Sequence, residues 1–177
     1  MRNGMMRFKG ILFIYLCLLV SFASAQDRAA SAKFFNQAMI KFRQAKNEEA
    51  IRLLTSAIAS DTLNDDAWIK RGFIKSLVSD FEGEMQDYNR VIAIHPEHKW
   101  AYISRGSALN RMEKYTEAIA DFNKALVIDP KDAEAYNNRG FAKKGLGDKE
   151  GACSDWTSSL RFGNSEASII LKNNYCK

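Results

Sequence analysis

The stretch YNNRGFAKKGLGDKEGACSDW, residues 136–156, has two segments of helical composition separated by the turn residues Gly147 and Asp148. The same order of aromatic, small and charged residues stands 34 residues earlier in YISRGSALNRMEKYTEAIADF, residues 102–122. It stands 34 residues earlier again in WIKRGFIKSLVSDFEGEMQDY, residues 68–88. The chain therefore repeats itself, and each repeat is expected to fold as a pair of helices.

Four consecutive copies of this pattern follow one another without an insertion, and they occupy residues 31–64, 65–98, 99–132 and 133–166. Counted from the first residue of a copy, small residues dominate the eighth and twentieth places, and aromatic residues dominate the fourth and twenty-fourth. Glu84 is the exception at the twentieth place, where the other copies have alanine. Because one helix pair cannot bury its apolar face alone, the copies are expected to stack.

This spacing of small and aromatic residues resembles the tetratricopeptide repeat, a helix–turn–helix unit of 34 residues. The resemblance covers residues 31–166 and implies an all-α fold, a right-handed α-solenoid of stacked helix pairs. After the last copy, the stretch NSEASIILKNNYCK combines capping residues with an apolar side. Residues 165–177 are therefore expected to form a C-terminal capping helix and tail that cover the end of the stack.

A second regularity links the two helices within a copy. In three copies the seventh place holds arginine and the twenty-third holds aspartate, as the pairs Arg71–Asp87, Arg105–Asp121 and Arg139–Asp155. The first copy lacks both. Residues that are present and absent together indicate contact, so these residues are predicted to form structural ion pairs. A ladder of arginines that binds a ligand is a weaker alternative, because a paired guanidinium has few donors left.

The first 25 residues differ in kind from the rest. A basic start precedes the uncharged apolar run ILFIYLCLLVSF, and Ala23-Ser24-Ala25 supplies the small residues that a signal peptidase accepts. This order predicts a signal peptide over residues 1–25, cleaved near Ala25-Gln26, and an N-terminal leader over residues 26–30. The protein is therefore expected to be exported, to the periplasm or outside the cell, with no membrane insertion after signal removal.

Loss of the signal peptide also changes the charge of the chain. The full sequence has 26 basic and 21 acidic residues, and three of the basic residues lie in the signal peptide, so the remaining net charge is 23 − 21 = +2. These charges are interspersed, with no block of lysine and arginine that would follow a phosphate backbone. Nucleic-acid binding is therefore not expected.

No arrangement of residues typical of an enzyme occurs in the sequence. The two histidines, His95 and His98, lie in one loop with only Glu97 near them as a third metal ligand. Two solvated loop residues are the favoured interpretation, and no metal is expected. The glycines fall at packing and turn places, so no phosphate-binding loop and no cofactor are expected either. The protein is predicted not to be an enzyme.

Two cysteines remain after export, since Cys17 lies within the signal peptide. Cys153 lies near the start of the second helix of the last repeat, and Cys176 lies near the end of the capping helix. Consecutive helices run antiparallel, which places both thiols at the same end of the stack and predicts a disulfide. Two buried free thiols are a weaker alternative in an exported protein, and a redox pair would need Cys-x-x-Cys.

The resemblance to the tetratricopeptide family implies a concave groove lined by the first helix of each pair. Carried onto this sequence, the predicted partner-binding residues are Phe35, Met39, Phe42, Ile69, Phe73, Leu77, Trp100, Ile103, Arg111, Phe141 and Lys144. Such a groove suits an adaptor or scaffold that binds a partner protein or peptide of unknown identity. The alternative is self-assembly, in which the apolar first repeat pairs with itself to build a structural homo-oligomer of the cell envelope.

Overall fold

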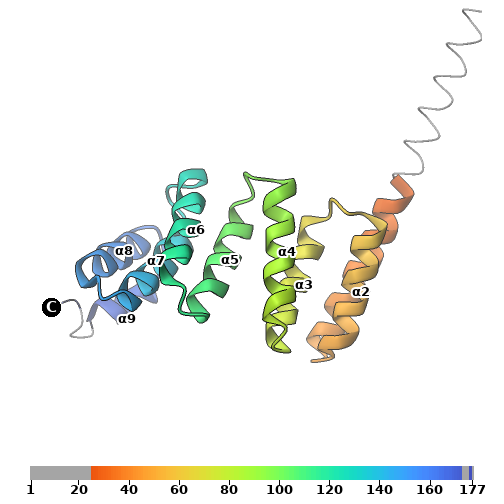
Figure 1. Cartoon of the computed structure of the whole chain (residues 1–177), viewed down its shortest axis with the longest axis horizontal. Coiled ribbons are helices and arrows are strands. Elements are labelled where there is room, and N and C mark those ends of the chain that lie inside the picture. Colours follow the sequence, from red (N-terminus) through yellow and green to blue (C-terminus); the bar gives the residue numbers. More distant parts are fainter. Residues whose placement is uncertain (1–24, 173–175, 177) are drawn as a thin grey trace, which may run out of the picture. The chain divides into compact units, whose positions relative to one another are not determined.

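Helices account for nearly all of the structure, a computed structural model that describes residues 25–172 and 176 (Figure 1). A first helix covers residues 25–43. The helices that follow are α2 (Asn47–Ser60), α3 (Asp65–Leu77), α4 (Phe81–Ile94), α5 (Lys99–Arg111), α6 (Tyr115–Ile128), α7 (Ala133–Gly145), α8 (Lys149–Arg161) and α9 (Ala167–Lys172). No strand occurs among these described residues, and the predicted all-α fold of helix pairs is confirmed.

The helices keep the period of the sequence. The first helices α3, α5 and α7 begin at Asp65, Lys99 and Ala133, and the differences 99 − 65 and 133 − 99 are both 34. The second helices α2, α4, α6 and α8 begin at the same spacing. Each pair of helices from α3 to α8 therefore corresponds to one copy of the sequence pattern.

The two ends of the chain differ in part from expectation. The predicted signal peptide, residues 1–25, lies outside the described residues except for Ala25. Residues 26–30 are helical and continue into the first helix, because Ala29 and Ala30 are strong helix formers. The capping helix is present as α9, which begins at Ala167, and most of the predicted tail, residues 173–175 and 177, lies outside the described residues. Within the described part of the chain, no helix has both the length and the apolar composition needed to cross a membrane.

The chain divides into two compact units, of which the first ends at Ala67 and the second begins at Trp68. The N-terminal unit contains the helix over residues 25–43 and α2. Its core is built from small and aliphatic side chains, with Ala38 of the first helix and Leu54 of α2 both fully buried. Asn64 Nδ2 donates a hydrogen bond to Ser31 Oγ at 2.8 Å and so joins the end of this unit to its first helix.

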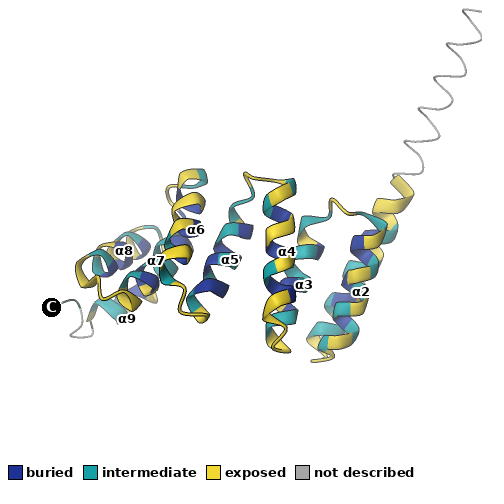
Figure 2. Ribbon diagram, viewed as in Figure 1, coloured by how far each residue is buried: buried dark blue, intermediate teal, exposed yellow. Residues whose placement is uncertain are grey.

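The C-terminal unit contains the helix pairs α3–α4, α5–α6 and α7–α8, with α9 packed beside α8 (Figure 1). Buried and exposed residues alternate along each helix, as expected for amphipathic helices (Figure 2). The three pairs bury large side chains at the twenty-fourth place of the repeat, where Phe122 and Trp156 are fully buried. The core of this unit therefore lies between the helices of each pair and continues from one repeat to the next.

Eighth-place glycines let the two helices of a repeat approach closely. A Cβ atom on Gly106 would lie 2.8 Å from Phe122 Cε1, closer than real Cβ atoms approach other heavy atoms. The equivalent distances are 2.9 Å for Gly72 and Tyr88 Cε1, and 2.7 Å for Gly140 and Trp156 Nε1. Glycine at the eighth place and an aromatic ring at the twenty-fourth are therefore two halves of one contact.

The turn between the two helices of each repeat uses a left-handed residue at the fifteenth place. The backbone φ is +57° at Ala45, +64° at Ser79, +58° at Glu113 and +80° at Gly147. Only the last of these residues is glycine, which adopts this conformation without the Cβ penalty that the other three carry.

Replacement of Gly147 by alanine is expected to lower the free energy of unfolding by about 1 kcal/mol. No heavy atom lies within 4 Å of the added Cβ, so the effect comes from the backbone conformation alone. Glu113→Gly, at the same place of the preceding repeat, is the matched variant and should have the opposite sign. Urea unfolding of the parent protein and of the two variants tests this prediction. A Gly147→Ala variant with the same free energy of unfolding as the parent would contradict the described turn.

The last residue of each repeat caps the helix that begins the next one. Asn64 Oδ1 accepts a hydrogen bond from Ala67 N at 3.0 Å, and Asp132 Oδ1 accepts one from Ala135 N at 2.8 Å. His98 does the same through Nδ1, which accepts from Ala101 N at 3.2 Å. His98 therefore has a helix-capping role, comparable to that of the polar residues in the other repeats.

Candidate functional site

A cavity of about 270 Å³ opens on the C-terminal unit where side chains of three first helices meet. These helices are α3, α5 and α7, and α4 contributes one tyrosine. The lining residues are Ile69, Lys70, Phe73, Tyr88, Trp100, Ile103, Ser104, Ser107, Arg111 and Glu134. Because the first helices of successive repeats line it, the cavity lies on the face that the sequence indicated as the binding groove.

Two large aromatic side chains on the cavity wall are nearly half exposed to solvent. Phe73 is 43% exposed and Trp100 is 48% exposed, whereas the aromatic residues of the core are buried. Lys70 Nζ lies 5.7 Å from the centre of the Phe73 ring, and Lys99 Nζ lies 4.7 Å from the centre of the Trp100 ring. The cavity therefore combines apolar surface with nearby positive charge.

An ion pair between neighbouring repeats forms another part of the wall. The Glu84 carboxylate, only 2% exposed, accepts a short hydrogen bond from the half-exposed guanidinium of Arg111. Glu84 was the residue that broke the small-residue rule at the twentieth place, and this partner accounts for it, because a buried carboxylate needs a charged partner. Burial raises the pKa of Tyr88, and the adjacent Glu84 carboxylate adds to the effect.

Glu134 brings a carboxylate to the cavity from the start of α7. The residue is exposed overall, yet desolvation of its carboxyl by the surrounding protein raises its pKa, and the negative charge of Asp132 raises it further. Asp132 itself is bound by Lys99 at 2.8 Å, and the same Lys99 Nζ lies 2.7 Å from Asp129 Oδ2. These bonds lower the pKa of the Asp129 carboxyl and raise the pKa of Lys99.

The structure brings some of the predicted groove residues together and separates others. Those that line the cavity are Ile69, Phe73, Trp100, Ile103 and Arg111. Leu77, Phe141 and Lys144 belong to the same unit and do not line it, and Phe35, Met39 and Phe42 belong to the N-terminal unit. Phe141 instead packs edge-on against Trp156, with 5.4 Å between the ring centres.

Five lining residues were absent from the predicted set, namely Lys70, Tyr88, Ser104, Ser107 and Glu134. Ser107 stands at the ninth place, which Phe73 and Phe141 of the predicted set also occupy. Lys70 and Ser104 both stand at the sixth place, directly after Ile69 and Ile103 of the predicted set. Tyr88 stands at the aromatic twenty-fourth place, where it is buried in the core and also lines the cavity.

The three predicted arginine–aspartate pairs are all in contact, each through two parallel hydrogen bonds. In the third repeat, Arg105 Nε and Nη2 donate to Asp121 at 2.8 and 2.6 Å. The other two pairs have distances of 2.7–2.9 Å. The pKa values of Arg105 and Arg139 are raised by the hydrogen bonds to these aspartates. The arginines therefore link the two helices of a repeat, because the two parallel N–H groups of a guanidinium match the two oxygens of a carboxylate.

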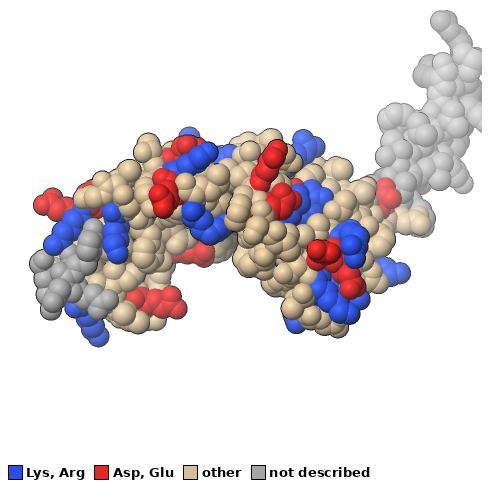
Figure 3. All heavy atoms as spheres, turned by 60° about the horizontal axis from the view of Figure 1, so that its bottom comes forward, with Lys and Arg blue, Asp and Glu red and all other residues tan. Residues whose placement is uncertain are grey.

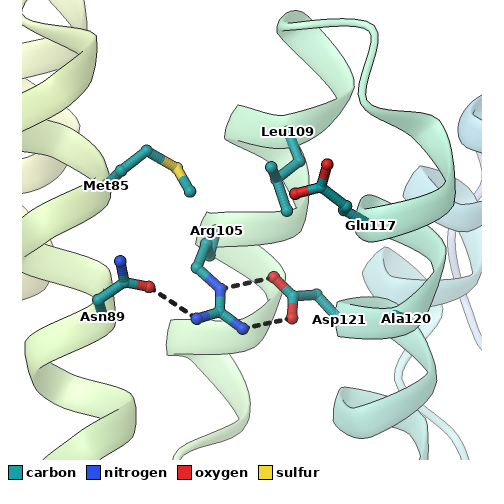
Figure 4. Close-up of a pocket in the computed structure, with 7 residues that line it drawn as sticks. All are labelled: Met85, Asn89, Arg105, Leu109, Glu117, Ala120 and Asp121. Carbon is teal, nitrogen blue, oxygen red and sulfur yellow. Dashed lines mark hydrogen bonds and ion pairs between the residues drawn. The ribbon is translucent and has the colours of Figure 1, made fainter.

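A second opening, of about 410 Å³, is lined by the Arg105–Asp121 ion pair and by other side chains of α4, α5 and α6 (Figure 4). Its floor is the Arg105 guanidinium, which also donates to Asn89 Oδ1 of the preceding repeat at 2.7 Å. The same link recurs one repeat later, where Arg139 donates to Asn123 Oδ1 at 2.6 Å. The sequence analysis missed these asparagines. Their contacts show that this crevice is a joint between repeats, in which the arginine, aspartate and asparagine are already paired with one another.

The two cysteines lie together at the C-terminal end of the stack. Their Cα atoms are 5.7 Å apart, and the sulfur atoms are at bonding distance, 2.05 Å. Both pack against the small cluster formed by Trp156 of α8 and Ala167 of α9. The arrangement places Cys153 where it can fasten the short α9 to the last repeat.

The distribution of charged residues can be compared with that of a metal centre and of a single-sign charged surface. On the face seen in Figure 3, acidic and basic side chains are interspersed rather than gathered by sign. No group of three or more His, Cys, Asp and Glu side chains is placed to hold a metal ion within residues 25–172 and 176.

Comparison with protein families gives a match on the repeats that build this site. Residues 106–147, from the middle of α5 to the turn after α7, match the family described as TPR repeat, the tetratricopeptide repeat. This segment is similar to the tetratricopeptide repeat. The match covers less than half of the sequence, and the regular helix pairs extend the same architecture on both sides of it.

Several solved tetratricopeptide repeat structures are similar to this chain. MamA from Desulfovibrio magneticus RS-1, residues 41 to the end, superposes with a TM-score of 0.68 at 19% identity, over 76% of each chain. YrrB, a TPR protein with an unusual peptide-binding site, superposes with a TM-score of 0.68 at 16% identity, over 81% of this chain and 74% of YrrB.

A third similar structure is the first TPR of Spaghetti (RPAP3), bound to the HSP90 peptide SRMEEVD. It has a TM-score of 0.64 at 24% identity and covers 68% of this chain and 95% of that one. At these identities the likeness shows the tetratricopeptide fold alone. None of the curated proteins compared with the chain matches it.

Proposed function

We propose that this protein is a non-enzymatic interaction module that holds a peptide, or an extended segment of a partner protein, in the cavity between α3, α5 and α7. The observation that carries the proposal is the pair of aromatic side chains, Phe73 and Trp100, that stand nearly half exposed on the cavity wall. Two of the similar structures are, respectively, a TPR protein with a peptide-binding site and a TPR with a bound peptide, which supports this use of the fold.

The chemistry of the wall suits an extended peptide. Burial of the part of each aromatic side chain that is still exposed contributes on the order of 1 kcal/mol, and aromatic residues are frequent hot spots of binding. Arg111 keeps part of its guanidinium open to solvent and can donate to backbone carbonyl groups. Ser104 and Ser107 add hydroxyl groups between the apolar residues. Apolar anchors with a few hydrogen-bond donors are the usual composition of a peptide site.

Affinity capture from an extract of the producing cells tests the proposal. The parent protein is compared with Phe73→Ala/Trp100→Ala, for which the loss of two hot spots should weaken partner binding about 100-fold. Phe81→Ala/Leu160→Ala is the matched control, since both side chains are exposed apolar residues outside the cavity. Thermal unfolding of each protein shows that it is folded before capture.

A partner that is retained by the parent and the control and lost by the cavity variant supports the proposal. A partner that all three proteins retain equally places the binding surface elsewhere and contradicts it. If the parent captures only further copies of itself and sediments as a concentration-dependent oligomer, the protein is a self-assembling structural protein, and the proposed binding function is wrong.

We also propose that the protein acts after export, in the periplasm or outside the cell, with a disulfide between Cys153 and Cys176. The signal-like order of residues 1–25 supports export, and the 5.7 Å between the two Cα atoms supports the bond. In an oxidising compartment such a pair is expected to be bonded.

Replacement of both cysteines by serine is expected to lower the free energy of unfolding by about 3 kcal/mol at most, because the bond closes a loop across 23 residues of sequence separation. The loss should begin at α9, the short helix that the bond fastens. Thermal unfolding and hydrogen exchange at α9 measure it. Thiol labelling of the exported, denatured protein is the companion measurement, and two reactive thiols would contradict the bond.

A further inference from the structure

The charges on the cavity wall are not equally compensated. Arg111 is paired with the buried Glu84, so this part of the wall is close to neutral. Lys70, on α3, lies over the ring of Phe73. Glu134, on α7, has no salt bridge and no hydrogen bond to another side chain among the described residues. Its carboxylate is therefore the acidic group of the cavity that is left without a direct counter-ion.

The surroundings of Glu134 increase this local excess of negative charge. Asp129, Asp132 and Glu134 are three carboxylates, Lys99 is bonded to both aspartates, and Lys131 acts on Asp129 by its charge, so the group sums to 2 − 3 = −1. Desolvation raises the pKa of the Glu134 carboxyl, and the negative charge of Asp132 raises it further. A cation brought to Glu134 would relieve both effects, since it would pair with a partly desolvated carboxylate.

Trp100 places an aromatic surface beside this carboxylate. Trp100 and Glu134 both hold the second place of their repeats, on α5 and α7, and both line the cavity. Lys99 occupies one part of the indole surface, and the side chain is still 48% exposed. A lysine or arginine side chain from a partner can lay its apolar stem along the indole and bring its charged end to the carboxylate.

We propose that the segment held in the cavity carries a lysine or arginine side chain that lies across Trp100 and ends at the Glu134 carboxylate. Neighbouring apolar side chains of the same segment pack against Phe73 and Ile103. This inference rests on the proposed function, because it names the chemistry of the segment that the cavity binds. It applies to the part of the cavity at Trp100 and Glu134, whereas Lys70, over the Phe73 ring, is the cavity cation that would attract an acidic side chain.

A display library of random ten-residue peptides is the probe. It is selected in parallel on the parent protein, on Glu134→Lys and on the cavity variant Phe73→Ala/Trp100→Ala. Glu150→Lys is the matched control, because it makes the same charge change at an exposed residue of α8 outside the cavity. Peptides enriched on the parent are expected to contain lysine or arginine next to apolar residues, and the same peptides should be enriched on Glu150→Lys.

Selection on Glu134→Lys should lose the basic residues and favour aspartate or glutamate. A synthetic peptide from the parent selection should bind Glu134→Gln about tenfold more weakly, the effect expected for loss of one charged hydrogen bond. Replacing the peptide's basic residue by norleucine should weaken binding to the parent and leave binding to Glu134→Gln nearly unchanged.

Two results separate failure of this inference from failure of the proposed function. If the enriched peptides need Phe73 and Trp100 but show no basic residue, or are the same on Glu134→Lys, the charge assignment is wrong and the cavity still binds peptides. If no peptide is enriched on the parent relative to the cavity variant, the proposed function is contradicted and this inference with it.

Discussion

Replacement of Asp155 by alanine is expected to lower the free energy of unfolding by about 3–5 kcal/mol. The Asp155 carboxylate is 3% exposed and accepts hydrogen bonds from Arg139 Nε at 2.8 Å and Nη2 at 2.7 Å. Lys143 Nζ lies 2.9 Å from the same carboxylate. Loss of the carboxylate leaves two largely buried cations facing each other without an anion, which costs more than the pair contributes when intact.

Asp121→Ala provides the matched comparison for this prediction. Asp121 accepts from Arg105 in the same way, but Leu109 stands where the last repeat has Lys143, so only one cation loses its partner. Urea unfolding should therefore show a smaller loss for Asp121→Ala than for Asp155→Ala. Equal losses of free energy for the two variants would contradict the described network. A loss below about 1 kcal/mol for Asp155→Ala would also contradict it, because that is the most that an exposed ion pair contributes.

Trp156→Ala is the second variant with a large expected effect, a loss of about 3–5 kcal/mol. The side chain is fully buried, lies against Gly140, and donates from Nε1 to the carbonyl oxygen of Asn137 at 3.2 Å. Its ring is also the surface on which α9 packs, through Ala167 and neighbouring residues. Alanine would leave a cavity between α7 and α8 and remove the support of the capping helix.

Trp156→Phe is the control, because Phe122 fills the same place of the preceding repeat against Gly106. We expect the phenylalanine variant to retain most of the stability and the alanine variant to lose the protection of α9 amides against hydrogen exchange. A Trp156→Ala protein with unchanged unfolding and a protected α9 would show that the last repeat is not packed as described.

Much of the fold could be predicted from the sequence because residues that contact each other recur together at fixed places of the repeat. Glycine at the eighth place and a ring at the twenty-fourth recur, so the contact of Gly106 with Phe122 follows from the pattern alone. The pairing of Arg105 with Asp121 follows in the same way, since both residues are absent together in the first copy. Periodic residues can be checked against one another, and this makes such assignments secure.

Residues that occur once in the chain could not be assigned in this way. Glu84 breaks the pattern visibly, but its partner Arg111 lies 27 residues away in the next repeat and has no equivalent pair with which to compare it. The composition of the cavity was likewise only partly predictable, because the place in the repeat does not determine where a side chain points. Phe73 and Phe141 share the ninth place, yet Phe73 lines the cavity while Phe141 turns to Trp156.

The central claim is that a partner occupies the cavity between α3, α5 and α7, and site-specific photo-crosslinking tests it most directly. A p-azidophenylalanine in place of Phe73 puts the photoreactive group on the cavity wall with little change in the shape of the ring. The control carries the same group in place of Phe81 of α4, whose side chain is similarly exposed and lies outside the cavity. We predict that irradiation in the extract joins the partner to the protein labelled at Phe73 and not to the one labelled at Phe81. Crosslinking from Phe81 alone, or equally from both positions, would contradict the account.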